Sequence, residues 1–307
     1  MKPGSGKEVL VLAGPTAVGK TAVGLVLAQR LKAHVISADS RQIYKYLDIG
    51  TAKPKAVELR AVSHHMTDIL TPDLPYSAAA FAAEARRVMD ELDKKDQAYI
   101  IAGGSGLYLK ALTEGLVDIP SADPAIRREL KDFSQAKGNE ALLQRLAECD
   151  PETAQRLSVN DGVRIIRALE VFLLTGKPLS LWFREERQGD SRNYKLIVLD
   201  LDRKILYQRI DDRVETMMTQ GLLNEVKSLM AQGYGPDSPG LQTVGYQELM
   251  AHLSGKTDLA EAIRLIKRNT RHYAKRQLTW FRKMNYQQWV NCNPSDCPED
   301  IANKLSV

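Results

Sequence analysis

The chain has 307 residues, of which 44% are hydrophobic and 26% are charged, and its formal net charge is +5. This length predicts a core domain with a second lobe, and the composition is that of a globular protein that can bury a core. No run approaches the roughly 18 apolar residues of a membrane span, and the N-terminus lacks the apolar region of a signal peptide. The three cysteines form no C-x-x-C pair, which suits a reducing compartment. We therefore expect a cytoplasmic protein, and a monomer because no apolar heptad suggests an interface.

A phosphate-binding loop is predicted near the N-terminus, where residues 14–21 read GPTAVGKT. An apolar run, 9–13, precedes this loop and a helix-like run, 22–28, follows it, as the pattern G-x-x-x-x-G-K-[ST] requires. Backbone N–H groups of such a loop converge on an anion at a helix N-terminus. Lys20 would reach the terminal phosphate oxygens, and the Thr21 hydroxyl would bind Mg²⁺. The predicted phosphate-binding residues are Gly14, Pro15, Thr16, Ala17, Val18, Gly19, Lys20 and Thr21.

A carboxylate is expected beside this loop. The second predicted strand, 34–39, ends in polar residues, and the carboxyl ends of parallel strands face the ligand crevice. The segment 40–44 is then a loop near the phosphate, with Asp39 at its start. Two interpretations of Asp39 stay open on spacing alone: it meets substrate, or it caps the next helix.

The next buried strand, 98–102, ends in the glycine-rich sequence Gly103-Gly104-Ser105-Gly106. A Walker ATPase usually places an Asp for Mg²⁺ at the end of such a strand. The glycines therefore argue against a motor ATPase.

The segment between these strands is predicted to begin irregularly and to end in a helix. Residues 50–76 carry three prolines, and the adjacent His64 and His65 would not face one another, which argues against a shared metal. Ser77 is a predicted N-cap for an amphipathic helix that runs to about Lys94.

An inserted helical lobe is predicted for 119–193, where helical segments with a basic excess replace the alternation of strands and helices. Asn160-Asp161-Gly162 forms a predicted turn before a helix over 163–174, which ends at Gly176. The basic residues of this lobe are Arg127, Arg128, Lys131, Arg145, Arg156, Arg164 and Arg167.

The α/β core is predicted to comprise 1–118 and 194–307. A core strand over 195–202 and a helix over 203–220 resume it, and the last third is predicted to be helical to about Asn285. The fold class expected is α/β, a parallel sheet flanked by helices with an inserted all-helical lobe.

A basic helix is predicted near the C-terminus, because residues 262–283 contain no acidic residue. A run of charge is usually a solvated face, but such a face normally carries both signs. An anion-facing helix is the favoured interpretation, with RNA or a bound diphosphate as the anion. Its basic residues, mostly at three- or four-residue spacing, are Arg264, Lys267, Arg268, Arg271, Lys275, Arg276, Arg282 and Lys283.

Three functions fit these patterns: a nucleotide or small-molecule kinase, an enzyme that acts on nucleic acid with diphosphate as leaving group, or an RNA-binding switch. The basic helix and lobe favour the second and third over the first. The carboxylate beside the phosphate site favours an enzyme over a switch.

The sequence closely resembles the bacterial tRNA dimethylallyltransferases in blocks that span nearly the whole chain. Ser105 is one departure, since Thr is expected there, but a hydroxyl is kept. The blocks are GPTAVGKT (14–21), SADSRQIY (37–44), DIGTAKP (48–54), HHMTDI (64–69), GGSGLY (103–108), NDGVRIIRALEV (160–171), VGYQE (244–248) and YAKRQLTWFR (273–282).

The resemblance implies a P-loop NTPase-like core and a prenyl transfer. Dimethylallyl diphosphate and the anticodon stem-loop of tRNA would be the substrates, Mg²⁺ the cofactor, and the exocyclic N6 of the adenosine 3′-adjacent to the anticodon the acceptor. The loop with Lys20 and Thr21 would stabilise the leaving diphosphate. Asp39 would be the general base or acceptor for the N6 proton.

The resemblance also places further residues at the site. Arg213 is a candidate second cation on the diphosphate; the alternative is an exposed helix charge paired with Asp211 or Glu215. Ser40 and Gln42 would read base edges, while Arg127, Arg164 and Arg167 would meet phosphates. The implied tRNA contacts are Asp39, Ser40, Arg41, Gln42, Ser105, Arg127, Val163, Arg164, Ile165, Ile166 and Arg167.

Overall fold

The computed structural model describes residues 8–117, 119–185 and 189–305. It contains a six-stranded sheet in the order β3-β2-β4-β1-β5-β6, and every neighbouring pair is parallel. The predicted α/β class is therefore confirmed. The strands are β1 (Glu8–Ala13), β2 (His34–Ser37), β3 (His64–His65), β4 (Tyr99–Gly103), β5 (Asn193–Leu201) and β6 (Gln288–Cys292).

Two compact units make up the chain: residues 1–113 with 190–307, and residues 114–189. The predicted lobe, 119–193, overlaps the second unit, but β5 already begins at Asn193 and belongs to the first unit. Asp118, where the first predicted core segment ends, lies outside the described residues, as do residues 1–7, 306 and 307 of the predicted core and 186–188 of the predicted lobe.

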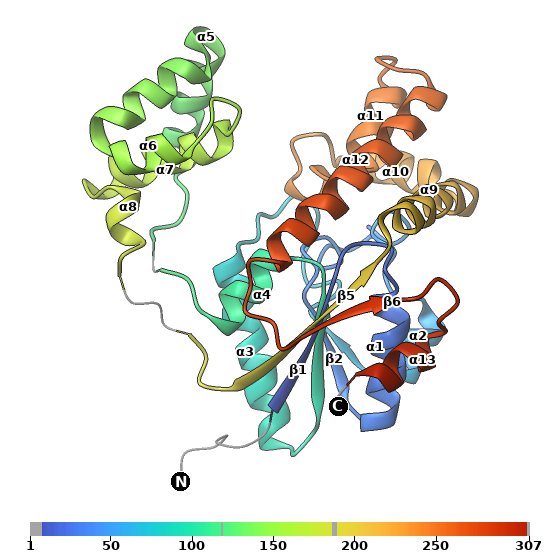
Figure 1. The fold of residues 1–307 in the computed structure, drawn as a ribbon. Coiled ribbons are helices and arrows are strands. Elements are labelled where there is room, and N and C mark those ends of the chain that lie inside the picture. The colour runs from blue at the N-terminus through green and yellow to red at the C-terminus, as the bar shows by residue number, and fades with distance from the viewer. Residues whose placement is uncertain (1–7, 118, 186–188, 306–307) are drawn as a thin grey trace. The chain divides into compact units, whose positions relative to one another are not determined.

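The first unit carries helices on both sides of its sheet. Figure 1 shows α1 and α13 on one side, and α3 and α4 on the other. Its helices are α1 (Lys20–Leu31), α2 (Ala56–Ala61), α3 (Ala78–Lys94), α4 (Gly106–Thr113), α9 (Arg203–Gln220), α10 (Leu222–Ala231), the 3-10 helix η1 (Pro239–Leu241), α11 (Tyr246–Leu253), α12 (Leu259–Phe281) and α13 (Pro298–Lys304).

The helix α3 begins where its sequence predicts. The Ser77 side chain accepts a hydrogen bond from the N–H of Ala80, as an N-cap does. Phe81, Ala85, Met89 and Leu92 recur at helical spacing and are buried, so one stripe of the helix covers the sheet. The prediction for 50–76 was incomplete, because α2 and β3 lie within this segment.

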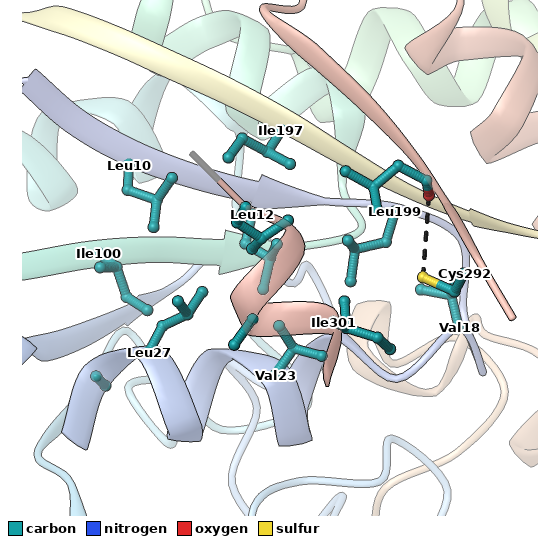
Figure 2. Close-up of a cluster of buried hydrophobic side chains, with 14 of the residues drawn as sticks. Leu10, Leu12, Val18, Val23, Leu27, Ile100, Ile197, Leu199, Cys292 and Ile301 are labelled. Atoms are coloured by element: carbon teal, nitrogen blue, oxygen red, sulfur yellow. Dashed lines mark hydrogen bonds between the residues drawn. The ribbon is translucent and has the colours of Figure 1, made fainter. Parts of the chain in front are cut away.

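A cluster of buried side chains fixes the phosphate-binding loop to the sheet (Figure 2). Leu10 and Leu12 of β1 pack with Val23 and Leu27 of α1, and Val18 of the loop is fully buried in the same cluster. Complete burial of such a side chain contributes on the order of 1.5–3 kcal/mol. The loop is therefore anchored by its own apolar residue before any anion binds.

A second cluster joins α9, α10, α11 and α12 to the loop after β2. At its edge, the Glu225 carboxylate accepts hydrogen bonds from the N–H groups of Asp48, Ile49 and Gly50 and from the Tyr246 hydroxyl. Four donors on one carboxylate hold the segment 48–50 against these helices.

The second unit is helical and has its own core. Its helix α7 ends at Gly176, which adopts a left-handed conformation with φ of 68°, as the sequence predicts. Leu130, Leu146 and Leu169 are among its buried residues. The helices are α5 (Pro124–Cys149), α6 (Pro151–Arg156), α7 (Gly162–Thr175) and α8 (Leu179–Trp182), and α5 is interrupted at Gly138. None of the helices described in either unit is both long and apolar enough to cross a membrane.

Candidate active site

The phosphate-binding loop joins the carboxyl end of β1 to the first turn of α1. Gly19 is the N-cap residue and has no side chain with which to occupy the first-turn N–H groups. Those groups have no helical partner of their own, and the helix dipole favours an anion beside them. The Lys20 ammonium lies back over the loop and donates to the Pro15 carbonyl at 2.8 Å. The geometry is that of an anion cradle.

Three charged side chains meet at this loop: Lys20, Asp39 and Arg213. Burial lowers the pKa of Lys20 to about 8, Asp39 opposes this shift, and the positive charge of Arg213 adds to it. Burial also lowers the pKa of Arg213, again opposed by Asp39. Two cations and one carboxylate from distant parts of the sequence therefore share one poorly solvated site.

The alternative interpretation of Arg213 is wrong. Asp211 forms an ion pair with Arg271 at 2.5 Å, and Glu215 forms one with Lys267, so both expected partners are engaged with α12. Arg213 has no ion pair within the described part of the chain. Its guanidinium is available to an anion bound at the loop.

A cavity of about 370 Å³ opens beside these groups. Its lining includes the polar side chains of Thr16, Asp39 and Arg213. The lining also includes apolar side chains, those of Val214, Met217, Leu222, Val244 and Ile266. The cavity can therefore hold a ligand that has a charged end and a hydrocarbon end.

Asp39 uses its two carboxylate oxygens differently. Oδ1 accepts from the N–H of Arg41 at 2.8 Å and from that of Gln42 at 3.3 Å, which stabilises a turn. Oδ2 has no hydrogen-bond partner among the residues the structure describes. No helix follows directly, so Asp39 caps a turn and not the helix that the alternative interpretation required. One oxygen stays free to face a ligand.

Oxygen donors suited to Mg²⁺ gather next to the loop. Thr21, Ser37 and Asp39 line a small cavity of about 50 Å³ together with Lys20. Hydroxyl and carboxylate oxygens are the ligands Mg²⁺ prefers, and Mg²⁺ usually takes only one or two carboxylates plus phosphate oxygens. In the described ranges, no group of three or more His, Cys, Asp or Glu residues is arranged to hold a metal ion. The donor set thus fits Mg²⁺ bound jointly with a phosphate ligand.

The adjacent histidines face different partners. His65 Nε2 lies 2.9 Å from Nδ1 of His34, while His64 Nδ1 lies 2.8 Å from the Val62 carbonyl. The two imidazole rings therefore contact different groups.

The glycine-rich loop after β4 leaves no room for a Walker carboxylate. A Cβ on Gly103 would lie 2.1 Å from the Ala38 carbonyl oxygen. Ser105, the predicted tRNA contact, is largely buried; its hydroxyl accepts from the Ser40 N–H at 2.9 Å and is hydrogen-bonded to Tyr273. Burial, with Asp39 nearby, raises the pKa of Tyr273, which therefore stays protonated. Ser105 thus joins the Asp39 loop to α12.

The three residues after Asp39 differ in their access to the cavity. Ser40 and Arg41 line the large cavity, and Arg41 also donates to the Pro239 carbonyl. The Gln42 amide, by contrast, accepts from Ser37 and donates to two carbonyls, those of Thr51 and Ala52. The Gln42 amide is therefore held by the protein itself, and its contact with a base edge stays a prediction.

The basic helix α12 has two kinds of cation. Arg264, Lys267 and Arg271 form ion pairs with Glu261, Glu215 and Asp211, so neighbouring carboxylates neutralise part of the predicted positive face. Arg268, Lys275 and Arg276, together with Lys283 just beyond the helix, have no ion pair in the ranges described, whereas Arg282 lies 4.0 Å from Asp200. Of these, Arg276 lines the large cavity. Only the second group suits an anion outside the protein.

Gln277 of α12 contacts two loops of the site, which the sequence does not indicate. Gln277 is 6% exposed, accepts from the Thr16 N–H and donates to the Gly104 carbonyl, both at 2.8 Å. Nothing in a run of basic residues distinguishes a glutamine that will face the phosphate-binding loop.

In the second unit, two predicted phosphate contacts have a structural partner. Arg127 and Arg167 each form an ion pair with the buried Glu170 carboxylate, at 2.8 Å. Breaking such pairs would leave a buried charge, so both arginines stabilise the unit, and their contact with tRNA phosphates stays a prediction.

The predicted tRNA segment 163–167 splits by exposure. Ile165 and Ile166 are buried in the core, which corrects the prediction for their side chains. Val163 is 85% exposed, and the Arg164 side chain is 70% exposed. Val163 and Arg164 are therefore the members of the segment that face solvent.

The similarity of this chain to known proteins covers both of its units. Residues 42–284 match the family IPP transferase. The chain is 48% identical to "tRNA dimethylallyltransferase 2" of Geotalea uraniireducens, covering 96% of this chain and 94% of that protein. It is 50% identical to "tRNA dimethylallyltransferase 1" of Trichlorobacter lovleyi, with 94% of each covered.

Solved structures give the same relationship. A full-length tRNA isopentenylpyrophosphate transferase from Bacillus halodurans superimposes with a TM-score of 0.71 at 38% identity, covering 96% of this chain and 93% of the other. A eukaryotic dimethylallyltransferase acting on tRNA gives a TM-score of 0.75 at 31% identity, covering 91% and 70%.

Proposed function

This chain belongs to the IPP transferase family, and from that premise we propose that it is a tRNA dimethylallyltransferase. It transfers a dimethylallyl group from dimethylallyl diphosphate to the exocyclic N6 of the adenosine 3′-adjacent to the anticodon, and it releases diphosphate. The observation that carries this proposal is the meeting of Lys20, Asp39 and Arg213 beside a cavity that both polar and apolar side chains line.

The polar side of the site suits the leaving diphosphate. The allylic carbon gains cationic character as the C–O bond breaks, so stabilising the departing anion lowers the barrier. The N–H groups at the start of α1, the Lys20 ammonium and the Arg213 guanidinium act on this anion. Fixed charges in a poorly solvated site need little reorganisation during reaction. The apolar side chains that line the cavity accommodate the hydrocarbon part of the same substrate.

The carboxylate side of the site suits the acceptor. The N6 amine is a weak nucleophile because its lone pair is delocalised into the purine ring. The unengaged Oδ2 of Asp39 accepts the proton that N6 loses as the new C–N bond forms. Its other oxygen holds the turn 39–42, which keeps the carboxylate in place.

We propose that Mg²⁺ binds with the diphosphate at the Thr21 hydroxyl, next to Asp39 and Ser37. When bound, it neutralises charge that develops on the leaving group. Lys20 and Arg213 serve the same anion from the protein side.

The RNA substrate is proposed to be the anticodon stem-loop. A base must leave its stack to enter the cavity, and an unpaired loop base does so at the lowest cost. Ser40 and Arg41 at the cavity, and Val163 and Arg164 of the second unit, are the predicted contacts that face a ligand or solvent. Cytoplasmic location and a monomeric state stay predictions from the sequence.

The test is a transfer assay with labelled dimethylallyl diphosphate and unmodified tRNA, run in parallel with labelled ATP. We expect the label of the prenyl donor to enter RNA and no phosphoryl transfer from ATP. Phosphoryl transfer without RNA prenylation would instead establish the kinase alternative, which family membership does not favour.

A further inference from the structure

One side chain of α12 connects two loops of the site. Gln277 accepts a hydrogen bond from the N–H of Thr16 in the phosphate-binding loop at 2.8 Å. Its Nε2 donates to the carbonyl of Gly104 in the loop after β4, also at 2.8 Å. The two loops follow β1 and β4, which are far apart in the sequence, and the helix comes from near the C-terminus. The Gln277 amide therefore links the phosphate-binding loop to the loop after β4 through a single side chain.

The surroundings of the amide fix its position. Gln277 is 6% exposed, and a Cβ on Gly104 would come within 2.5 Å of Nε2, so glycine at 104 is what admits the side chain. The same hypothetical Cβ would lie 3.6 Å from the Lys20 ammonium, which shows how close the bridge lies to the cation of the loop. A buried hydrogen bond of this kind is strong because water does not compete for it.

The neighbours of Gln277 on α12 contact the same loop. Tyr273 is hydrogen-bonded to Ser105, and the Trp280 ring lies where a Cβ on Gly106 would be 2.2 Å away. Tyr273, Gln277 and Trp280 are spaced four and three residues apart, so they share one face of the helix. Because Tyr273 and Trp280 contact the segment after β4, this face of α12 also brings the Gln277 amide next to Thr16.

The bridge bears on diphosphate binding through Thr16. Because Gln277 occupies the Thr16 N–H, this end of the loop is held by the protein, while the N–H groups at the start of α1 remain for an anion. Thr16 and Ala17 also line the large cavity. A loop held in its binding shape loses less conformational freedom when the anion binds, and affinity rises accordingly.

We propose that Gln277 is a positioning residue that pre-organises the phosphate-binding loop for diphosphate and holds it in register with the loop 103–106. The inference rests on the proposed function, since it assumes that the loop binds diphosphate. Gln277 does not itself touch the reacting atoms.

The test measures binding of inorganic diphosphate, in the presence of Mg²⁺, by calorimetry with the full chain. Gln277→Met keeps the side-chain length and removes both hydrogen bonds. We expect its Kd for diphosphate to rise about tenfold, because the loop must then be ordered when the anion binds. In the transfer assay, KM for dimethylallyl diphosphate should rise by a similar factor, while Kd for tRNA stays within about twofold of the unsubstituted protein.

A matched control is Gln287→Met. Gln287 also accepts a backbone N–H bond, from Leu196 at 2.6 Å, but it lines neither cavity of the site. We expect this variant to lose thermal stability without losing diphosphate affinity. Equal weakening in both variants, or unchanged affinity in Gln277→Met, would overturn the inference. Failure of the unsubstituted protein to bind diphosphate would instead contradict the proposed function.

Discussion

At the scale of single residues, the site depends on groups whose surroundings change their usual behaviour. Asp39 divides its carboxylate between a turn and the cavity, and Lys20 sits where burial lowers its pKa to about 8. The unengaged oxygen of Asp39 and the lowered pKa of Lys20 each lead to a measurable consequence.

Replacing Asp39 with Asn separates its two tasks. The amide oxygen can still accept from the N–H of Arg41, but the side chain can no longer take a proton from N6. We expect turnover to fall by roughly 10²–10⁴, the usual contribution of a general base, with tRNA affinity within a few-fold. Single-turnover transfer measures the first quantity and filter binding the second. Turnover near that of the unsubstituted protein would remove Asp39 from the mechanism. Asp48→Asn, on a nearby loop, is the control.

The pKa of Lys20 predicts how diphosphate binding depends on pH. Only the ammonium form attracts the anion, and the free protein loses this proton as pH rises through about 8. The bound anion raises the pKa of Lys20, so binding takes up a proton above that pH. We expect affinity to fall by at most about tenfold per pH unit above this point. Calorimetry in buffers of different ionisation enthalpy detects the proton, and Lys20→Met should lack this component. An identical pH profile in that variant would contradict the assignment.

At the scale of elements, the arginines of α5 and α7 in the second unit serve two purposes. Arg127 of α5 and Arg167 of α7 neutralise the buried Glu170, whereas Arg164 of α7 faces solvent. Arg164 does form an ion pair with Asp161, at 3.8 Å, but on the surface of the unit. The helices therefore separate cations that hold the unit together from a cation that is exposed to solvent.

This separation predicts opposite outcomes for two matched substitutions. Arg127→Met removes a charged hydrogen bond to Glu170 and should lower the free energy of unfolding of the second unit by about 1–2 kcal/mol. Arg164→Met should change that free energy by less than about 0.5 kcal/mol and should weaken tRNA binding instead. Denaturant unfolding and tRNA titrations on both variants decide between the assignments. A stability loss in Arg164→Met alone would reverse them.

At the scale of the whole molecule, the modest net charge of +5 conceals an uneven distribution. Carboxylates of α9 neutralise some cations of α12, while Arg268, Lys275, Arg276 and Lys283 have no ion pair among the described residues. Such unpaired cations release counterions from RNA when they bind its phosphates.

We therefore expect tRNA binding to weaken with salt. The logarithm of the binding constant should fall linearly with the logarithm of salt concentration, with a slope of about −0.7 for each phosphate neutralised in single-stranded RNA. Titrations at several salt concentrations give the slope. Replacing Arg276 with Met should reduce its magnitude, whereas replacing the ion-paired Lys267 should not. A flat salt response would argue against a basic RNA surface.

The sequence by itself determined the features that depend on local geometry. The loop 14–21 was predicted because a short pattern between a strand and a helix specifies its own backbone path. Helix α3 and its Ser77 cap followed from spacing and from a local hydrogen bond. The family could be named because its blocks run through the whole chain.

Only the tertiary structure decided which distant surfaces meet. From the sequence, Arg213 could bind the diphosphate or pair with Asp211 or Glu215, and the structure decides because α12 engages both of those carboxylates. Ile165 and Ile166 lie in a segment predicted to bind RNA, yet the core of the second unit takes their side chains. Gln277 can bond to both loops because α12 crosses them, although they lie far from this helix in the sequence. Periodicity records which face of a helix is apolar, but not which partner that face will meet, and the chemistry of this site depends on the partners.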